Sequence, residues 1–323
     1  MIKSQAPILT IYTQRTEFQL SFFSSIKTDT QIGVDFQPTG VAVVQVENTK
    51  KVAGKILRSV YLPSRGQQAQ LESLRNWITK HSLQRASCVC LIADTDCDIN
   101  QIEKPEVDDS ELAQALTWRI KDLVSYEVDS AVVDVYPMPV SGKNNTQQVS
   151  VVSADEKTVA AYVQSIQSSG MKLLAIDIHD LVTGNLPVVR QGFKKAQAIL
   201  SLGDSAGVLS IFNDTDLYLS RHFKIGLSQL GFASGEDQSI YDNLLLEVQR
   251  SMDYYESYYG LGSVSVMEIF PRTPVTEKMV LYLQNLISYD IDFVVTNNAD
   301  SDQTPELDSR CFHAYCAALR GTH

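Results

Sequence analysis

The chain has 323 residues, of which 44 % are hydrophobic and 20 % charged, so it is long enough for two cores and its composition excludes a disordered protein. A formal net charge of −11 repels phosphate groups and anionic lipid headgroups, which excludes nucleic acid and the membrane surface as direct partners. No run of about 18 apolar residues occurs, so no membrane-spanning segment is predicted. The five cysteines lack CxxC spacing and favour a reducing cytoplasm over a zinc site.

Residues 1–30 have no basic start followed by a clean apolar core, so we expect an N-terminal extension and not a signal peptide. The pattern then predicts a β-hairpin over residues 32–46, in which Pro38 and Gly40 supply the turn. A third extended segment follows at residues 56–62. Apolar residues at helical spacing predict a helix over 68–81. These elements open a first lobe, residues 31–193.

Residues 87–178 follow the order β-α-β-β-α-β and predict a compact α+β subdomain inserted in the first lobe. Its helices are expected to begin at two capping boxes, Asp108 with Glu111 and Ser153 with Glu156. Its strands are expected at 88–93, 131–136, 148–152 and 172–178. We expect one sheet with both helices packed on it.

Residues 194–323 are predicted to form a second lobe. Three successive strands are expected at 198–202, 208–213 and 217–223, followed by a long helix over 241–259. A strand at 264–270, a helix over 278–287, a strand at 293–296 and a closing helix over 308–319 complete it. The first two strands and their turn repeat the pattern near residue 32, so the fold class is α/β with two related lobes.

Two β-hairpins that open two successive α/β modules are the layout of the actin-like, ribonuclease-H-like superfamily. The segment IGVDFQPTGVAVVQV resembles the opening hairpin of PilM, the actin-like protein of type IV pilus assembly. Further segments resemble PilM in the same order: LTWRIKDLVSYEVDSAVVDVYP, GMKLLAIDIHDL, LEVQRSMDYYES and HAYCAALRG. The likeness covers residues 32–321 and looks closest to the PilM counterpart of the mannose-sensitive haemagglutinin (MSHA) pilus system.

This resemblance implies an actin-like fold and a role in the cytoplasm, peripheral at the inner membrane through partners. The implied partner is a PilN-like single-pass inner-membrane protein, whose short cytoplasmic tail would bind the hairpin at 32–46 and the inserted subdomain. The pilus assembly ATPase is a further implied partner. A negatively charged chain would also steer a basic tail. The aromatic residues Trp118, Tyr254 and Tyr258 lie off the apolar stripes of their helices and are the candidate partner contacts.

In the actin-like superfamily the hairpin turns grip nucleotide phosphates, which requires small residues because a Cβ atom blocks close approach of the backbone. The resemblance places Asp35 and Thr39 in the first turn. However, Gln37 stands where the family has a glycine, and Ala42 where PilM-like proteins have a lysine. The first turn is therefore degenerate.

In the second turn the family's Asp-Ile-Gly becomes Ser201-Leu202-Gly203, and only Asp204 could replace the missing metal-facing carboxylate. The glycines expected beside the adenine are replaced by the segment MEIFPR at 267–272. We therefore predict a non-hydrolysing protein with no cofactor. Weak binding of ATP with magnesium is the alternative, as an ATPase or ATP-sensing switch of the same machine.

Two other possibilities stay open from the sequence, a sugar- or acetate-kinase-like enzyme and a fibre-forming actin. The enzyme would need an acidic catalytic residue that the sequence does not identify. His179 lies between Asp177 and Asp180, which suggests a metal site, but neighbouring residues at a strand end converge poorly on one ion. A capped turn is favoured there, and no metal site is predicted.

Overall fold

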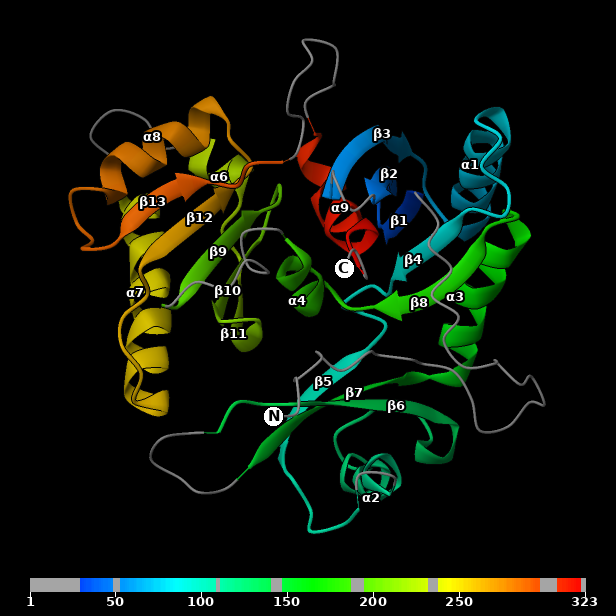
Figure 1. Ribbon diagram of the computed structural model, residues 1–323, viewed down its shortest axis with the longest axis horizontal. Helices are drawn as coiled ribbons and strands as arrows, with labels where there is room; N and C mark the ends of the chain where they lie inside the picture. Colours follow the sequence, from blue (N-terminus) through cyan, green and yellow to red (C-terminus); the bar gives the residue numbers. More distant parts are fainter. Residues whose placement is uncertain are drawn as a thin grey trace. The chain divides into compact units, whose positions relative to one another are not determined.

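The computed structural model describes residues 30–48, 53–108, 111–140, 147–186, 195–231, 238–296 and 307–320 (Figure 1). The expected extension at 1–30 lies outside these residues, apart from its last residue. The chain divides into two compact units. The first contains residues 1–137, 149–182 and 297–323, and the second contains residues 138–148 and 183–296.

The first unit is built on a five-stranded sheet in the order β3-β2-β1-β4-β8. Its strands are β1 (Thr30–Gln37), β2 (Gly40–Asn48), β3 (Ala53–Pro63), β4 (Ser87–Leu91) and β8 (Lys172–Asp177). The strands β1, β2 and β3 form an antiparallel meander, whereas β1, β4 and β8 run parallel. All five residues of β4 are buried, as expected for a parallel strand covered on both faces.

Helices cover both faces of this sheet. The residues of β1 show which helices lie on which face, because successive side chains of a strand point to opposite faces. Ile32 and Val34 share a core with residues of α1 (Gln67–Lys80) and α3 (Glu156–Ser168). Gly33 points the other way, toward α9 (Phe312–Ala318), where an added Cβ would lie 1.8 Å from the carbonyl oxygen of Ala314. The missing side chain lets α9 approach the sheet directly (Figure 1).

This contact corrects the expected lobe boundary. The sequence predicts a second lobe at 194–323 that includes the closing helix, but α9 belongs to the first unit. The guanidinium of Arg320 donates to the Asp177 carboxylate at the end of β8, at 2.6 Å. The side-chain amide of Gln31 on β1 donates to the Arg320 carbonyl at 3.0 Å. The C-terminal segment is thus fastened to both β1 and β8.

The inserted subdomain is also smaller than expected, because β4 and β8 pair with the main sheet. A separate three-stranded sheet has the order β5-β7-β6 and includes β5, which the sequence reading missed. Its elements are β5 (Asp98–Glu103), β6 (Ala131–Pro137), β7 (Gln148–Asp155), helix α2 (Leu112–Arg119) and the 3₁₀ turn η1 (Val128–Ser130). Leu116 and Ile120 of the α2 segment are buried against Val149 and Val151 of β7.

Neither predicted capping box begins a helix of this region. For α2 the N-cap residue is Glu111, without a side-chain hydrogen bond. For α3 the N-cap is Asp155, whose carboxylate accepts a hydrogen bond from the backbone N–H of Lys157 at 3.2 Å. An aspartate two residues after Ser153 took the capping role because β7 continues to that residue.

The second unit repeats the strand order of the first, as β11-β10-β9-β12-β13. Its strands are β9 (Gln197–Leu202), β10 (Gly207–Asn213), β11 (Asp216–Phe223), β12 (Val266–Phe270) and β13 (Asp290–Phe293). Again an antiparallel meander is followed by two parallel strands. The repeat predicted from the two hairpins is present in the five-stranded sheets of both units.

Helices of the second unit bury apolar stripes against this sheet. They are α6 (Leu227–Gly231), α7 (Ser239–Tyr259) and α8 (Pro274–Leu283). The second unit also contains the short 3₁₀ turn η2 (Thr183–Asn185). Two further short segments, α4 (His179–Val182) and η3 (Ser309–Cys311), belong to the first unit. Leu244, Val248, Met252 and Tyr255 form the buried stripe of α7, as predicted. The left-handed residue Gly260 ends this helix.

Candidate functional site

Chemically active side chains gather where the parallel strands of the first sheet end. Asp35 of β1, Leu91 of β4 and Asp177 of β8 lie in register, so the carboxyl ends of the three strands meet at one edge. In open α/β sheets this edge is where ligands bind. Asp94 follows β4, and His179 follows β8 as the first residue of α4.

His179 bridges two carboxylates. Its Nε2 lies 3.2 Å from Asp35 Oδ1, and its Nδ1 lies 2.8 Å from Asp94 Oδ1. The Asp35 side chain is 2 % exposed, whereas that of Asp94 is 55 % exposed. The imidazole therefore connects a buried acid to an acid at the surface.

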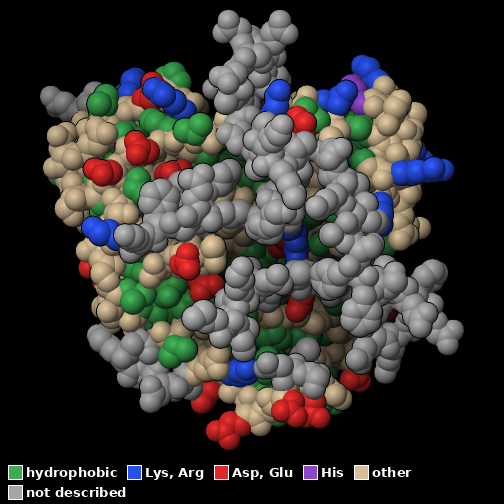
Figure 2. Space-filling view, viewed as in Figure 1, with side chains coloured by type: hydrophobic (Ala, Val, Ile, Leu, Met, Phe, Trp, Pro, Cys, Tyr) green, Lys and Arg blue, Asp and Glu red, His purple; other side chains and the backbone are tan. Residues whose placement is uncertain are grey.

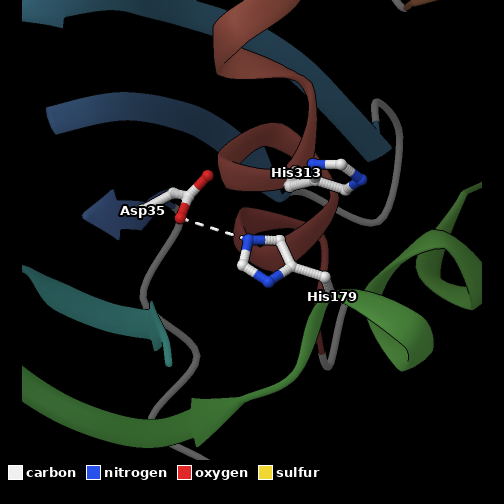
Figure 3. Close-up of side chains that lie close together, drawn as sticks. All are labelled: Asp35, His179 and His313. Carbon is white, nitrogen blue, oxygen red and sulfur yellow. Dashed lines mark hydrogen bonds and ion pairs between the residues drawn. The ribbon is translucent and has the colours of Figure 1, made fainter. Parts of the chain in front are cut away.

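His313 completes the site from α9. Its ring meets that of His179 edge-on, with ring centroids 5.0 Å apart, and Figure 3 shows both rings beside the Asp35 carboxylate. One ligand atom from each of the three residues lies within 4.8 Å of the others. Asp35, His179 and His313 are called the His–Asp cluster below.

The charges in this cluster are set by burial and by its neighbours. Burial disfavours the charged form of Asp35, but the charge of His179 and hydrogen bonds from His179 and Gln37 outweigh it and hold the pKa of Asp35 below its usual value. Burial likewise opposes the charged form of His179, yet Asp35 and Asp94 raise its pKa well above the usual value. Burial and then the positive His179 lower the pKa of His313 to about 4. The three residues thus form a carboxylate, an imidazolium and a neutral imidazole.

The predicted nucleotide residues of the first turn are engaged in local contacts. The Gln37 amide donates to Asp35 Oδ2 and to the Arg310 carbonyl, both at 2.7 Å. Thr39 is exposed in the turn, and its hydroxyl shares a hydrogen bond of 2.6 Å with the Tyr61 hydroxyl. The Gln37 side chain is therefore held in the first turn by contacts with β1 and with the segment before α9.

The second predicted turn is closed on itself as well. The N–H of Gly203 donates to the Ala206 carbonyl at 2.9 Å, and the Asp204 carboxylate accepts a hydrogen bond from the Ser228 hydroxyl. Backbone hydrogen bonds from Leu227 and Ser228 to Gly203 and Asp204 hold this loop at the start of α6. The backbone and side chain of Asp204 are thus both engaged in contacts within this loop and the start of α6.

The predicted partner contacts lie in different units. Trp118 on α2 is 62 % exposed, and Leu123 beyond the helix is 53 % exposed. Tyr254 on α7 is 40 % exposed and stacks on Tyr258, with ring centroids 5.1 Å apart and planes 10° apart. Tyr258 is half-buried and packs against the core of the second unit.

The sequence suggests a metal site of His179 with Asp177 and Asp180, but it predicts a capped turn there instead. Asp177 binds Arg320, and the actual neighbours of His179 are Asp35, Asp94 and His313. Asp35 and Asp94 could have been found by placing the ends of the parallel strands at one edge. His313 could not, because only the packing of α9 brings it there.

None of the helices in the described part of the chain combines the length and apolar character needed to cross a bilayer. No protein-family model matches the sequence, and no curated protein matches it.

Solved structures do resemble the chain. The structure of a "PilM-PilN type IV pilus biogenesis complex" is 14 % identical, with a TM-score of 0.65, over 91 % of this chain and 98 % of that chain. The cytoplasmic domain of EpsL, an inner-membrane component of the Vibrio cholerae type II secretion system, is 13 % identical over 80 % of this chain and 97 % of that chain, with a TM-score of 0.48. A Bacteroides thetaiotaomicron protein of actin-like ATPase fold and unknown function is 11 % identical over 84 % and 93 %, with a TM-score of 0.47. The duplicated sheets and the likeness to the PilM–PilN structure show that the chain has an actin-like α/β fold.

Proposed function

We propose that the chain is a scaffold of a type IV pilus assembly machine and binds the cytoplasmic tail of a PilN-like inner-membrane protein. The observation that carries this proposal is the likeness to the PilM–PilN structure, which extends over nearly the whole of both chains. The five sequence segments that resemble PilM in order support the same role. The degenerate nucleotide motifs are the basis of a finer assignment to the MSHA pilus, as an MshI-type protein that works in the cytoplasm beneath the inner membrane.

The surface around α2 offers what a peptide tail requires. Trp118 is a large aromatic side chain that is mostly exposed, which is the type of residue that dominates binding energy at interfaces. Leu123 adds a second exposed apolar side chain close by in sequence. In the sheet beneath α2, strands β5 and β6 are both edge strands, so an extended peptide could pair with either.

The same surface is acidic. Among the described residues between 101 and 130, the exposed basic side chains are Arg119 and Lys121. The exposed acidic side chains are Glu103, Glu106, Asp108, Glu111, Asp122, Glu127 and Asp129. Figure 2 shows acidic side chains gathered at the lower edge of the view, where Figure 1 draws α2. A basic tail would be attracted to this surface, and the attraction would weaken with salt.

Trp118→Ala tests this assignment directly. Titrating the full chain with a synthetic peptide of the partner's tail, by calorimetry, should show a loss of about 2 kcal/mol for the variant, which is roughly 30-fold in Kd. Wild-type affinity should also fall as the salt concentration is raised.

The matched control is Leu281→Ala, which truncates a side chain that is 66 % exposed in the second unit. It should leave the affinity for the tail unchanged. Equal affinity of wild type and Trp118→Ala would remove α2 from the receiving surface. Loss in a Tyr254→Ala variant alone would move that surface to the second unit.

The scaffold is proposed to work without ATP hydrolysis and without a bound nucleotide. Support comes from Gln37 filling the first turn and from the closed loop at Gly203 and Asp204. An ATPase or ATP-sensing switch of the same machine is the alternative, and binding of the pilus assembly ATPase is a further proposal. Neither the ATP-dependent alternative nor binding of the assembly ATPase changes the prediction that the chain binds the tail of the PilN-like protein.

A further inference from the structure

We propose that the His–Asp cluster binds a divalent transition-metal ion, which fastens α9 to the first sheet. Zinc is the ion used to test this site. Asp35 Oδ1, His179 Nε2 and a ring nitrogen of His313 are the three ligands. This site is independent of the tail-binding surface on α2.

The ligand set and its spacing suit such an ion. In a tetrahedral zinc site, ligands about 2.0–2.1 Å from the ion lie about 3.4 Å from one another. Asp35 Oδ1 and His179 Nε2 are already 3.2 Å apart, and all three ligand atoms lie within 4.8 Å. Small side-chain rotations of His313 would close the remaining gap. A fourth position would remain for water.

The surroundings of the cluster are those of a built metal site. Metal-binding histidines usually donate their second ring N–H to a carboxylate, which fixes the ring and its tautomer. Asp94 takes that role by binding His179 Nδ1 at 2.8 Å, which directs Nε2 into the cluster. Gln37 holds the other oxygen of Asp35 at 2.7 Å and so orients Oδ1 toward His179. Asp35 Oδ1 and His179 Nε2 are therefore both oriented toward the metal position before an ion binds.

His313 supplies an independent observation. Its contacts with His179 and Phe312 are ring packing, and neither of its ring nitrogens has a hydrogen-bond partner among the residues that the structure describes. Within the described ranges, a half-buried imidazole beside a buried carboxylate thus keeps a lone pair that no hydrogen bond uses. A metal ion would use that lone pair. It would also displace the proton of His179 Nε2 to solvent and take the place of that proton in balancing the charge of Asp35.

The chemistry selects zinc-like ions over magnesium. Imidazole nitrogen suits zinc, copper, iron and nickel, whereas magnesium prefers an octahedral shell of oxygen ligands. Two of the three ligands here are imidazoles. The site therefore differs from a magnesium site that depends on nucleotide phosphates, although Asp35 would belong to both.

The test is zinc titration of the full chain after removal of metals with a chelator, at pH 7.5, followed by competition calorimetry and thermal denaturation. We expect one zinc ion bound per chain, a zinc-dependent rise in Tm, and no displacement by millimolar magnesium. His179→Gln and His313→Gln should each lower zinc affinity at least ten-fold. Asp94→Asn, which removes only the orienting carboxylate, should lower it 10- to 100-fold.

His81→Gln is the matched control, because His81 packs against Trp77 on α1 and lies outside the cluster. It should bind zinc as the wild type does. Zinc affinity unchanged in His179→Gln, or lowered equally by His81→Gln, would overturn the proposal, as would the absence of zinc binding. The Asp94 side chain is exposed, so we expect the Asp94→Asn variant to fold. If His313→Gln is unstable, the zinc affinity of Asp94→Asn still decides the test. A negative result here leaves tail capture by Trp118 untouched.

Discussion

The carboxyl group of Glu268, on the sheet of the second unit, has a raised pKa. It lies on β12 directly opposite Asp292 of β13, and burial followed by the charge of Asp292 raises its pKa to about 7. The folded state therefore holds this proton more tightly than the unfolded chain. The stability that this provides is complete below about pH 4.5 and is lost as the pH rises through about 7.

Glu268→Gln should remove the dependence of folding stability on pH that the Glu268 carboxyl group causes. We expect the variant to have a higher Tm than the wild type at pH 8 and the same Tm at pH 4, measured by thermal denaturation in matched buffers. The control is Glu72→Gln on α1, an exposed glutamate, which should shift Tm equally little at both pH values. A difference between Glu268→Gln and wild type that is the same at pH 4 and pH 8 would contradict this account.

At the scale of elements, the start of α8 shows how a local hydrogen-bonding pattern decides a boundary. The sequence pattern predicts that this helix begins at residue 278, but it begins at Pro274. The Thr273 hydroxyl accepts from the N–H of Thr276 at 3.2 Å, and the Thr276 hydroxyl accepts from the N–H of Thr273 at 2.8 Å. The partner in this capping box is a threonine, so a search for glutamate or glutamine at its third position misses it.

Thr273→Ala should lower the free energy of unfolding by about 1 kcal/mol, because it leaves backbone donors of the first turn without an acceptor. Urea denaturation measures the loss. Thr273→Ser keeps the hydroxyl and should recover most of the stability. If serine and alanine destabilise equally, the threonine acts through its methyl group and not through the cap.

At the scale of the whole molecule, the closed turns predict that nucleotide does not stabilise the fold. Thermal denaturation with millimolar Mg-ATP should give the same Tm as a salt control of equal ionic strength. A ligand present at 100 times its Kd would stabilise the folded state by about 2.7 kcal/mol, which such an experiment detects. A Tm that rises and saturates with ATP concentration would favour the nucleotide-dependent switch.

The sequence by itself determined the local elements and their repetition. Strand segments such as β4 and β9 are short and mostly apolar, and Gly40 and Gly207 mark turns or strand starts that need little side-chain volume. These signals act between near neighbours, so they survive in a single sequence. The duplicated hairpins predicted two related α/β lobes, and the ordered resemblance of five segments to PilM predicted the actin-like fold.

Only the tertiary structure decided which sheet each strand joins and what meets at its edge. Parallel pairing of β4 with β1 and of β8 with β4 joins residues far apart in the chain, and no local pattern encodes that choice. The close approach of α9 over Gly33 then carries His313 to Asp35, which lies two residues along the same face of β1. The candidate metal site exists because long-range packing, and not spacing in the sequence, brings its three ligands together.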